Sequence, residues 1–254
     1  MQEINCMVRD DLSSKKMENT QDSIAIILAG GTGTRMGASL PKQYIEVEGR
    51  PIIYYTLRPF VNSGLFKVVV ICADPHWHSY ILENLPQGFE NIKIEFSNPG
   101  MTRQFTIYNA LNNIEKNNLI CSDVLIHDAA RPLVSENLLR NCLLALKDAD
   151  GVLPVIKVKD TIYQSFDGQH VSSLLDRNTL YAGQSPESFK FKPYLEAHRN
   201  SSEEELLKIN GSSELALLKG LKVDMIPGEE NNFKITSPED LQRFKQILRQ
   251  GDDC

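Results

Sequence analysis

Short apolar runs alternate with amphipathic segments along most of this chain, and that alternation limits the folds open to it. The apolar runs lie at residues 24–29, 67–73, 92–96, 123–127 and 151–157. Helical spacing of apolar side chains occupies residues 51–62, 105–114 and 136–147. Strands that are apolar on both faces and alternate with helices predict an α/β fold, with a mostly parallel sheet flanked by helices.

The composition is that of an ordinary globular protein. Of 254 residues, 41% are hydrophobic and 24% are charged, and one α/β domain of this length is common. The net charge of −6 argues against nucleic acid as a partner, and no apolar run approaches the length of a membrane span. The five cysteines are widely spaced without a Cys-x-x-Cys pair, which is typical of reduced thiols in a cytoplasmic protein and not of structural zinc.

The first 22 residues are polar and mixed in charge, and they lack the apolar stretch of a signal peptide. We therefore expect residues 1–22 to be a mobile N-terminal extension and residues 23–254 to form a single domain. The run SPED at 237–240 combines an N-cap, a proline at the first helical position and acidic residues in the first turn. It predicts the start of a final helix of about a dozen residues.

Residues 158–181 interrupt the alternation of strands and helices. They contain Phe166-Asp167-Gly168, a hairpin-turn signal, between two segments of alternating polarity. A hairpin inserted into a parallel-sheet protein leaves spare strand edges, which can pack on the same domain or on a partner chain. Both arrangements are open from the sequence.

A glycine-rich loop follows the first apolar run. Gly30, Gly31 and Gly33 allow the backbone to turn tightly and to point N–H groups at an anion. Their spacing fits neither the dinucleotide fingerprint nor a Walker A loop, and the glycines alone indicate no more than a tight strand–helix turn. Arg35 and Lys42 add one forked and one point-like cation, so the whole string favours binding of an extended polyphosphate.

A second polar run, HDAARP at residues 127–132, directly follows a predicted strand. Ligands of open α/β sheets bind at the carboxyl ends of strands. Asp128 there can coordinate Mg²⁺, hold a sugar hydroxyl or cap a turn, and Arg131 can add positive charge. For His127 we expect a buried, hydrogen-bonded side chain. Five further runs, taken singly, are typical of surface loops or caps, at residues 102–106, 159–161, 176–178, 185–186 and 232–236.

The order of six motifs resembles the cytidylyltransferases that make CDP-linked polyols. The motifs are LAGGTGTRMG…PKQY, PGMTRQFT, HDAARP, KDT, DRNTLY…SP and NNFKITSPEDL, spanning residues 24–248. The family includes the methylerythritol-phosphate enzyme of isoprenoid synthesis and the ribitol-5-phosphate enzyme of cell-surface polymer synthesis. The resemblance implies a Rossmann-like nucleotidyltransferase fold with an inserted β-hairpin dimerisation arm, and therefore a homodimer.

The resemblance also implies a CTP site. The residues expected to hold the triphosphate are Ala29, Gly30, Gly31, Thr32, Gly33, Thr34, Arg35 and Lys42. Gly100 and Thr106 are expected to recognise cytosine, with Thr106 standing where the family often has serine. Asp128 and Ala129 are expected between the ribose and the metal, and Asp128 is the expected ligand of Mg²⁺, the implied cofactor.

The resemblance implies a separate set of residues that bind the acceptor phosphate. They are Arg131, Thr161, Arg177, Ser185 and Lys234. Thr161 and Arg177 lie in the hairpin, which in this family crosses to the neighbouring subunit. Ser185 stands in the place of a family threonine, and Lys234 is expected to complete the site.

The implied reaction is attack of the acceptor phosphate oxygen on the α-phosphorus of CTP, with loss of pyrophosphate. The attacking oxygen is already ionised near neutral pH, which agrees with the absence of a convincing base or nucleophile motif. Catalysis then consists mainly of positioning and of electrostatic stabilisation by Arg35, Lys42, Lys234 and Mg²⁺.

The acceptor itself is less clearly indicated. Asn210-Gly211 stands where both family branches usually carry Thr-Asp, so part of the acceptor contact is missing or comes from Ser212, Ser213 or Glu214. HDAARP resembles the methylerythritol-phosphate branch, whereas residues 180–184 resemble the ribitol branch. The sequence slightly favours ribitol 5-phosphate or a related alditol phosphate, with 2-C-methyl-D-erythritol 4-phosphate as the alternative. A non-catalytic nucleotide-binding protein is an alternative of another class, and the glycine spacing disfavours a nicotinamide-dependent oxidoreductase.

Overall fold

The structure is a computed structural model that describes residues 22–31 and 40–251. The predicted N-terminal extension, apart from Asp22, lies outside the described residues, and so do Thr32, Gly33, Thr34 and Arg35 of the first loop. No helix in the described ranges combines the length and apolar character needed to cross a membrane.

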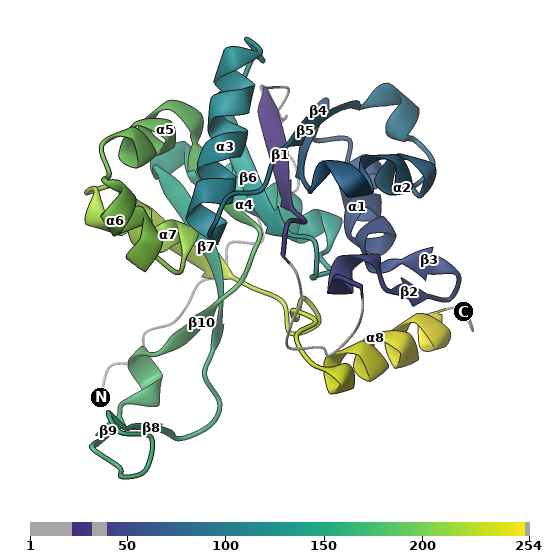
Figure 1. The fold of residues 1–254 in the computed structure, drawn as a ribbon. Coiled ribbons are helices and arrows are strands. Elements are labelled where there is room, and N and C mark those ends of the chain that lie inside the picture. The colour runs from purple at the N-terminus through teal and green to yellow at the C-terminus, as the bar shows by residue number, and fades with distance from the viewer. Residues whose placement is uncertain (1–21, 32–39, 252–254) are drawn as a thin grey trace.

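An eight-stranded sheet forms the middle layer of the molecule (Figure 1). Its strands lie in the order β10-β7-β11-β6-β1-β4-β5, and β12 also pairs with β7. The strands are β1 (Ser23–Leu28), β4 (Val68–Cys72), β5 (Lys93–Ser97), β6 (Asp123–Asp128), β7 (Gly151–Lys157), β10 (Tyr181–Gly183), β11 (Glu187–Lys190) and β12 (Val223–Pro227). The pairs β1–β4, β1–β6, β4–β5 and β7–β12 are parallel, whereas β10 and β11 run antiparallel to their neighbours. The predicted fold class, a mainly parallel sheet flanked by helices, is confirmed.

Strand β1 shows why the strands are apolar throughout. Ala25 and Ile27 point into the core on one face of the sheet, and Ile24 and Ile26 point into the core on the other. All four are at most 1% exposed. A central strand of this sheet therefore needs an unbroken apolar run, because successive side chains point to opposite faces and both faces are covered.

Helices cover both faces. One face carries α1 (Ile52–Asn62), α2 (His78–Glu83) and α4 (Glu136–Ala145). The other carries α3 (Arg103–Lys116), α5 (Phe191–Arg199) and α7 (Ser212–Leu218), with α6 (Glu203–Lys208) packed against this layer. The predicted helices at 51–62, 105–114 and 136–147 correspond to α1, α3 and α4.

The predicted final helix is confirmed as α8 (Pro238–Gly251). Asp240 Oδ2 accepts hydrogen bonds from the backbone N–H groups of Thr236 and Ser237, so the helix start is fixed by its own first turn. Phe244 of α8 packs with Ile52 and with the small hairpin of β2 (Glu46–Val47) and β3 (Arg50–Pro51). This packing places the segment before α8 against the body of the protein.

Residues 158–180 leave the sheet as an arm, seen at the lower left of Figure 1. The arm contains β8 (Ile162–Gln164) and β9 (Ser173–Leu175), which form a separate antiparallel pair. The predicted hairpin is thus confirmed, but its turn is a longer loop over residues 165–172, closed by hydrogen bonds from the N–H groups of Gln169 and His170 to Asp167. The arm projects away from the sheet, so its tip does not pack on the other described parts of its own domain.

Candidate active site

Strand β6 ends at Asp128, and the loop after it is held by contacts from distant parts of the chain. Ala129 donates its N–H to Leu28 O at 3.1 Å and accepts a hydrogen bond from Thr56 Oγ1 at 2.8 Å. Ile235 donates its N–H to Ala130 O at 2.8 Å. These backbone contacts fix the carboxyl end of β6 beside the segment that carries Lys234.

Asp128 is the centre of a cluster of cations at this position. Its Oδ2 lies 2.9 Å from Lys234 Nζ and 3.7 Å from Arg131 Nε, and its Oδ1 lies 3.6 Å from Arg103 Nε. Ser185 Oγ accepts a hydrogen bond from the backbone N–H of Asp128 at 3.1 Å. One carboxylate therefore gathers three positive side chains from three separate segments.

The charges in this cluster determine its ionisation. Burial alone would favour the neutral acid, but Arg103, Lys234 and Arg131 outweigh it and hold the pKa of Asp128 well below its usual range. Burial also opposes the charge of Arg103, yet Asp128 and Glu187 raise its pKa above the ordinary value. Three cationic side chains surround this one carboxylate, which gives an excess of positive charge around Asp128.

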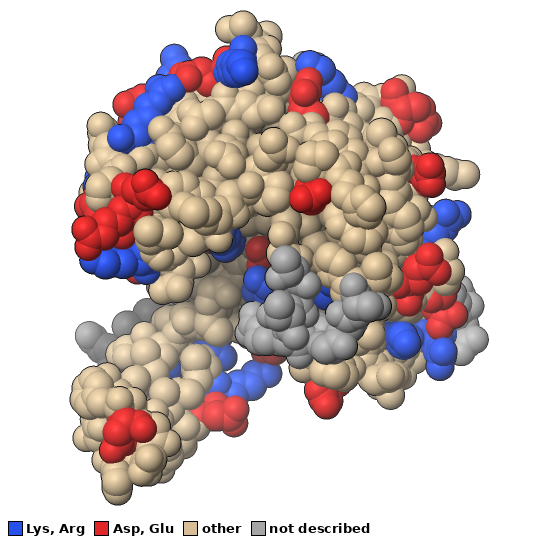
Figure 2. Space-filling model, in the orientation of Figure 1, with Lys and Arg blue, Asp and Glu red and all other residues tan. Residues whose placement is uncertain are grey.

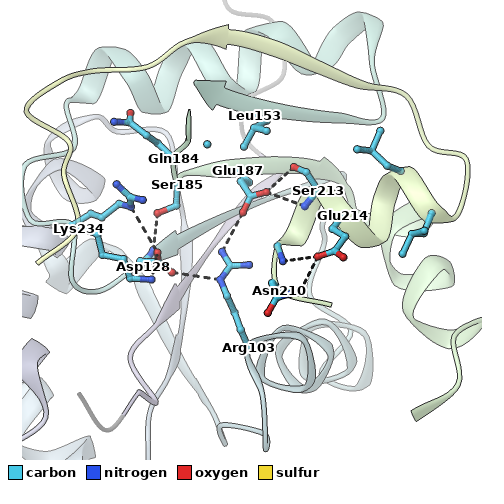
Figure 3. A pocket seen from close by; sticks show the side chains of 15 residues that line it. Arg103, Asp128, Leu153, Gln184, Ser185, Glu187, Asn210, Ser213, Glu214 and Lys234 are labelled. Atoms are coloured by element: carbon cyan, nitrogen blue, oxygen red, sulfur yellow. Dashed lines mark hydrogen bonds and ion pairs between the residues drawn. The ribbon is translucent and has the colours of Figure 1, made fainter. Parts of the chain in front are cut away.

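A pocket of about 660 Å³ opens beside this cluster (Figure 3). Its lining includes Arg103, Asp128, Arg131, Ser185 and Lys234. The rest of the wall comes from Leu153, Gly183, Gln184, Glu187, Asn210, Gly211, Ser213, Glu214, Leu217 and Leu218. Arg131 Nε is buried and makes no hydrogen bond within the described residues, and its ion-pair partner is Asp128 Oδ2 at 3.7 Å.

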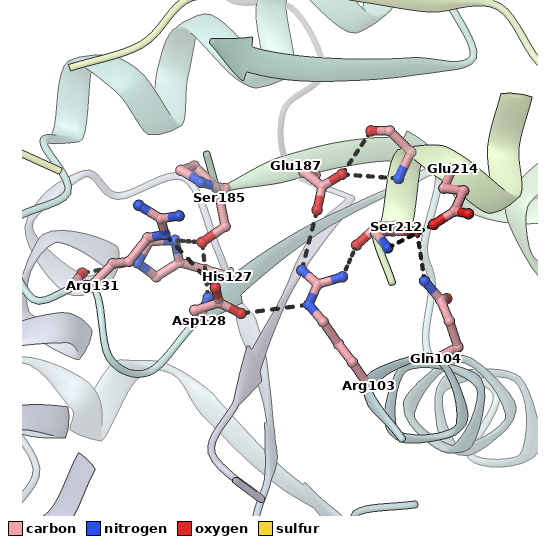
Figure 4. A network of polar contacts seen from close by, with 12 residues as sticks. Arg103, Gln104, His127, Asp128, Arg131, Ser185, Glu187, Ser212 and Glu214 are labelled. Carbon is pink, nitrogen blue, oxygen red and sulfur yellow. Dashed lines mark hydrogen bonds and ion pairs between the residues drawn. The ribbon is translucent and has the colours of Figure 1, made fainter. Parts of the chain in front are cut away.

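Arg103 joins the two sides of the pocket (Figure 4). It reaches from the start of α3 to Asp128 on one side, and its Nη2 lies 3.1 Å from Glu187 Oε1 on the other. Its Nη1 also donates to Ser212 Oγ, at the start of α7. The guanidinium fork thus links α3, β6, β11 and α7 around one cavity.

The described part of the first loop is fixed by Gln43. Gln43 Nε2 donates to Ala29 O at 2.5 Å and to Gly31 O at 2.9 Å, and its side chain is buried. Lys42 Nζ donates a hydrogen bond of 2.8 Å to the carbonyl oxygen of Ile235, the residue that follows Lys234. The first loop and the Lys234 segment are therefore neighbours.

Gly30 and Gly100 are required by close packing. A Cβ atom on Gly30 would lie 2.4 Å from Pro99 Cβ, and one on Gly100 would lie 2.4 Å from Phe105 Cβ. Gly100 donates its N–H to Thr106 Oγ1 at 3.0 Å. The loop after β1, the segment at Pro99-Gly100 and the first turn of α3 thus meet at one place.

Comparisons with known proteins agree with this arrangement. The protein-family profile described as 2-C-methyl-D-erythritol 4-phosphate cytidylyltransferase matches residues 23–250. This chain belongs to that family. It is therefore a nucleotidyltransferase of the cytidylyltransferase type, which sets aside the non-catalytic and oxidoreductase alternatives.

Individual relatives give the same result. A 2-C-methyl-D-erythritol 4-phosphate cytidylyltransferase of Prochlorococcus marinus is 35% identical over 88% of this chain and 98% of its own length. The enzyme of that name from Caldanaerobacter subterraneus subsp. tengcongensis is 32% identical over 89% of this chain and 98% of its own length. The crystal structure of the 4-diphosphocytidyl-2C-methyl-D-erythritol synthase of Anaerococcus prevotii has a TM-score of 0.76 and 25% identity, covering 91% of this chain and all of that one.

The described pocket is lined by only some of the residues expected from the sequence, namely Asp128, Arg131, Ser185 and Lys234. Lys42 is outside the described lining and contacts the Lys234 segment through Ile235 O. Ala29, Gly30, Gly31, Gly100, Thr106 and Ala129 lie at the adjoining loops. Thr161 and Arg177 are exposed on the arm and are absent from the described lining of the pocket.

Some residues expected in surface loops or caps are buried instead. Gln104 and Asn232 are fully buried, and Ser185 is buried as well. Arg103 lines the pocket, so its expected place in a simple cap is wrong, although Thr102 does cap α3. The expectation was wrong because each of these side chains contacts a segment far away in the sequence, which a local pattern does not show.

Two other residues went unnoticed in the sequence. Glu187 lines the pocket, but it begins a short strand, Glu187–Lys190, in which Phe189 alone is apolar, so its local sequence gives no signal. Gln43 holds the first loop, and nothing in its neighbourhood distinguishes it from a surface glutamine. Ser213 and Glu214, two of the three candidates for the contact missing at Gly211, do line the pocket.

His127 has the structural role expected of it. It is fully buried, its Nε2 lies 3.0 Å from Arg131 O and its Nδ1 lies 3.2 Å from Ser185 Oγ. Burial lowers its pKa to about 4, so the ring is neutral at pH 7. Burial likewise raises the pKa of the Cys72 thiol to about 12. Neither residue is suited to act as a base or nucleophile in the pocket.

Proposed function

We propose that this cytidylyltransferase takes 2-C-methyl-D-erythritol 4-phosphate as its acceptor and CTP as its nucleotide donor. The observation that carries the proposal is the match of residues 23–250 to the family of that name, with relatives covered over nearly their whole length. The slight preference for ribitol 5-phosphate expected from residues 180–184 finds no support among these relatives. Isoprenoid synthesis is accordingly the proposed pathway, in place of cell-surface polymer synthesis.

The pocket suits a reaction between two anions. The acceptor phosphate oxygen attacks the α-phosphorus of CTP, a new P–O bond forms, and pyrophosphate leaves. Lys234 and Arg131 offer positive charge at the carboxyl end of β6. Since the attacking oxygen is already ionised, the residues need only position the phosphates and reduce their repulsion.

The donor nucleotide is assigned to the adjoining loops. Ala29, Gly30 and Gly31, together with Lys42, adjoin the Lys234 segment and are proposed to hold the triphosphate, along with residues 32–35. Gly100 and Thr106 are proposed to recognise cytosine. Their mutual hydrogen bond and their contact with the first loop through Pro99 support a single continuous nucleotide site.

A magnesium ion fits this site only as a companion of the nucleotide. In the described ranges, no three His, Cys, Asp or Glu side chains group together as a metal site. Asp128 is a single carboxylate, and Mg²⁺ in phosphate-transfer sites is commonly held by one or two carboxylates plus substrate phosphates. When bound, the ion supplies positive charge that offsets the phosphate charge. Asp128 Oδ1, which has one described cation contact, with Arg103 Nε at 3.6 Å, is the proposed ligand atom.

The arm is proposed to complete the acceptor site of a second copy of the chain. Thr161 and Arg177 are exposed, and Arg177 Nη1 donates to Lys159 O within the arm itself. The arm tip also exposes apolar side chains, with Phe166 at 84% and Val171 at 67%. Figure 2 shows lysine and arginine atoms gathering in the recess between the arm and the body. A homodimer would place these features against a partner, and residues 23–254 remain proposed as one domain.

A panel of acceptors tests the proposed function. Pyrophosphate release is measured with CTP, Mg²⁺ and either 2-C-methyl-D-erythritol 4-phosphate, erythritol 4-phosphate or ribitol 5-phosphate. We expect the highest kcat/KM with the methylated tetritol phosphate. A higher value with ribitol 5-phosphate would reject the proposed acceptor and restore the ribitol branch.

A further inference from the structure

Glu187 is a pocket carboxylate that the proposed transfer reaction does not itself require. It is the first residue of β11 and pairs in register with Ile126 of β6, two positions before Asp128. It is 6% exposed, yet it lines the pocket. Burying a carboxylate is costly unless it has partners, so its contacts indicate what it does.

Three donors meet the Glu187 carboxylate. Arg103 Nη2 lies 3.1 Å from Oε1, and Oε2 accepts hydrogen bonds from Ser213 N at 3.0 Å and Ser213 Oγ at 2.6 Å. An ionised carboxylate offers about four acceptor positions. Glu187 therefore retains acceptor capacity on the oxygen that faces Arg103.

These contacts fix the wall of the pocket that precedes α7. Gln104 Nε2 donates to Gly211 O at 2.7 Å, and Tyr194 OH donates to Ser212 O at 3.1 Å. Together with Glu187 and Arg103, they hold residues 211–213 from α3, α5 and β11. The wall has a defined shape before any substrate binds.

The charges divide the pocket into two unlike parts. Asp128 is surrounded by three cations, whereas Glu187 has one, Arg103, which it shares with Asp128. Glu214, also on the lining, accepts hydrogen bonds from the backbone N–H groups of Asn210 and Gly211. The part beside α7 therefore carries more negative charge than positive charge, and the part beside Lys234 carries the reverse.

We propose that Glu187 is a specificity-determining residue for the acceptor, an inference that rests on the proposed function. The phosphate of the acceptor lies in the cationic part, and its uncharged polyol end lies towards Glu187 and the wall before α7. A hydroxyl there can donate to the carboxylate, whereas a second anionic group is repelled by this largely buried charge. The pocket thus selects polyol monophosphates and rejects acceptors with an acid at the end distant from the phosphate.

A matched pair of acceptors tests this selection. 2-C-Methyl-D-erythritol 4-phosphate is compared with 2-C-methyl-D-erythronate 4-phosphate, in which a terminal carboxylate replaces the terminal hydroxymethyl group. We expect the wild-type protein to favour the alditol strongly in kcat/KM, and Glu187→Gln to reduce that preference by about tenfold or more. Glu187→Asp keeps the charge and is expected to retain the preference.

Controls separate selection from stability. Glu204→Gln removes a carboxylate that is exposed on α6 and paired with Lys208, and it should leave the preference unchanged. If Glu187→Gln lowers kcat/KM equally for both acceptors, Glu187 only supports the fold and the proposal is wrong. Equal kcat/KM values of the wild-type protein for the two acceptors also overturn the proposed role of Glu187, and this measurement does not depend on whether the variant folds.

The outcome is independent of the identity of the natural acceptor. Should ribitol 5-phosphate be the better substrate, the same measurement is made with ribitol 5-phosphate and ribonate 5-phosphate. A wrong acceptor assignment then appears as a higher kcat/KM for another member of the acceptor panel. A wrong role for Glu187 appears as an unchanged ratio of kcat/KM between the alditol phosphate and the matching aldonate phosphate.

Discussion

The pocket at the end of β6 and the arm differ in how their functional residues are held. In the pocket, the Asp128 side chain is 12% exposed and contacts cations from three segments of the same chain. On the arm, Arg177 is exposed, and its guanidinium donates to a backbone carbonyl of the arm, Lys159 O. The first region is organised by its own chain before substrate arrives, whereas Arg177 on the arm lies outside the described lining of that pocket.

This difference indicates how strongly the charged residues of the pocket and of the arm can bind a phosphate. A preorganised cluster loses little conformational entropy when substrate binds, so its cations can act fully on the phosphates. An exposed arm residue gains comparable strength only when a second surface removes it from water. The contrast therefore predicts large effects for substitutions in the pocket, and effects for the arm that depend on a second copy of the chain.

The largest effect is expected for Lys234→Ala. Lys234 Nζ lies 2.9 Å from Asp128, and its charge is proposed to stabilise the transition state. Loss of such a contact lowers kcat on the order of 10³-fold. Pyrophosphate release measures the rate, and thermal unfolding shows whether the fold remains. Lys208→Ala, on the exposed face of α6, is the matched control, and a near-normal rate for Lys234→Ala would contradict the site assignment.

Much of the fold was predictable because β-strands buried on both faces leave an unmistakable pattern. The predicted strand at 151–157 coincides with β7, and the predicted strand at 123–127 falls one residue short of β6. Residues 187–227 carry no comparable pattern, since their strands are short and half-buried at several positions. They form β11, α5, α6, α7 and β12, and the pocket lining from this region comes from Glu187 of β11, from residues 210–211 and from α7.

The candidate site was predictable to the extent that motifs carry it. Asp128, Arg131 and Lys234 were chosen from their motifs, and the structure brings them together. Arg103 and Glu187 were not chosen, because their importance comes from a contact between residues 84 positions apart. Local patterns report burial and turns, whereas partners this distant are set only by the strand order of the sheet.

An intermediate effect, this time on stability, is expected for Asp128→Asn. The variant leaves Lys234, Arg131 and Arg103 without their shared carboxylate in a largely buried site, which should lower the free energy of unfolding by about 2–3 kcal/mol at pH 7. Thermal or denaturant unfolding measures the loss. An unchanged free energy of unfolding would mean that the cluster does not organise the pocket.

The same variant gives a pH signature. Because the pKa of Asp128 is held below its usual range in the folded state, the unfolded chain takes up this proton first as the pH falls. The stabilisation from ionised Asp128 is therefore complete above about pH 5 and is lost progressively below about pH 4. The difference in unfolding free energy between wild type and Asp128→Asn should shrink over that acid range and stay constant near neutrality.

The smallest effect is expected for Arg177→Ala on the arm. The substitution should raise the KM for the acceptor about tenfold, leave the KM for CTP nearly unchanged and leave the unfolding midpoint unchanged, because Arg177 is exposed in its own chain. Steady-state kinetics with each substrate varied in turn measures the two constants. Arg249→Ala, which removes an exposed arginine of α8 that pairs with Glu48, is the control and should change neither KM.

Mixing two differently impaired subunits decides whether the arm serves its own chain or a partner. If Arg177 acts across a dimer, a heterodimer of Lys234→Ala and Arg177→Ala chains contains one site with both residues intact and one site with neither. Random mixing makes half of the dimers heterodimers, so about a quarter of the wild-type activity should return at an acceptor concentration far below KM of the arm variant. If both residues act within one chain, mixing restores nothing. That result, or a monomer in sedimentation at micromolar concentration, would contradict the proposed role of the arm. Arg177 would then have no second copy of the chain whose acceptor site it could complete.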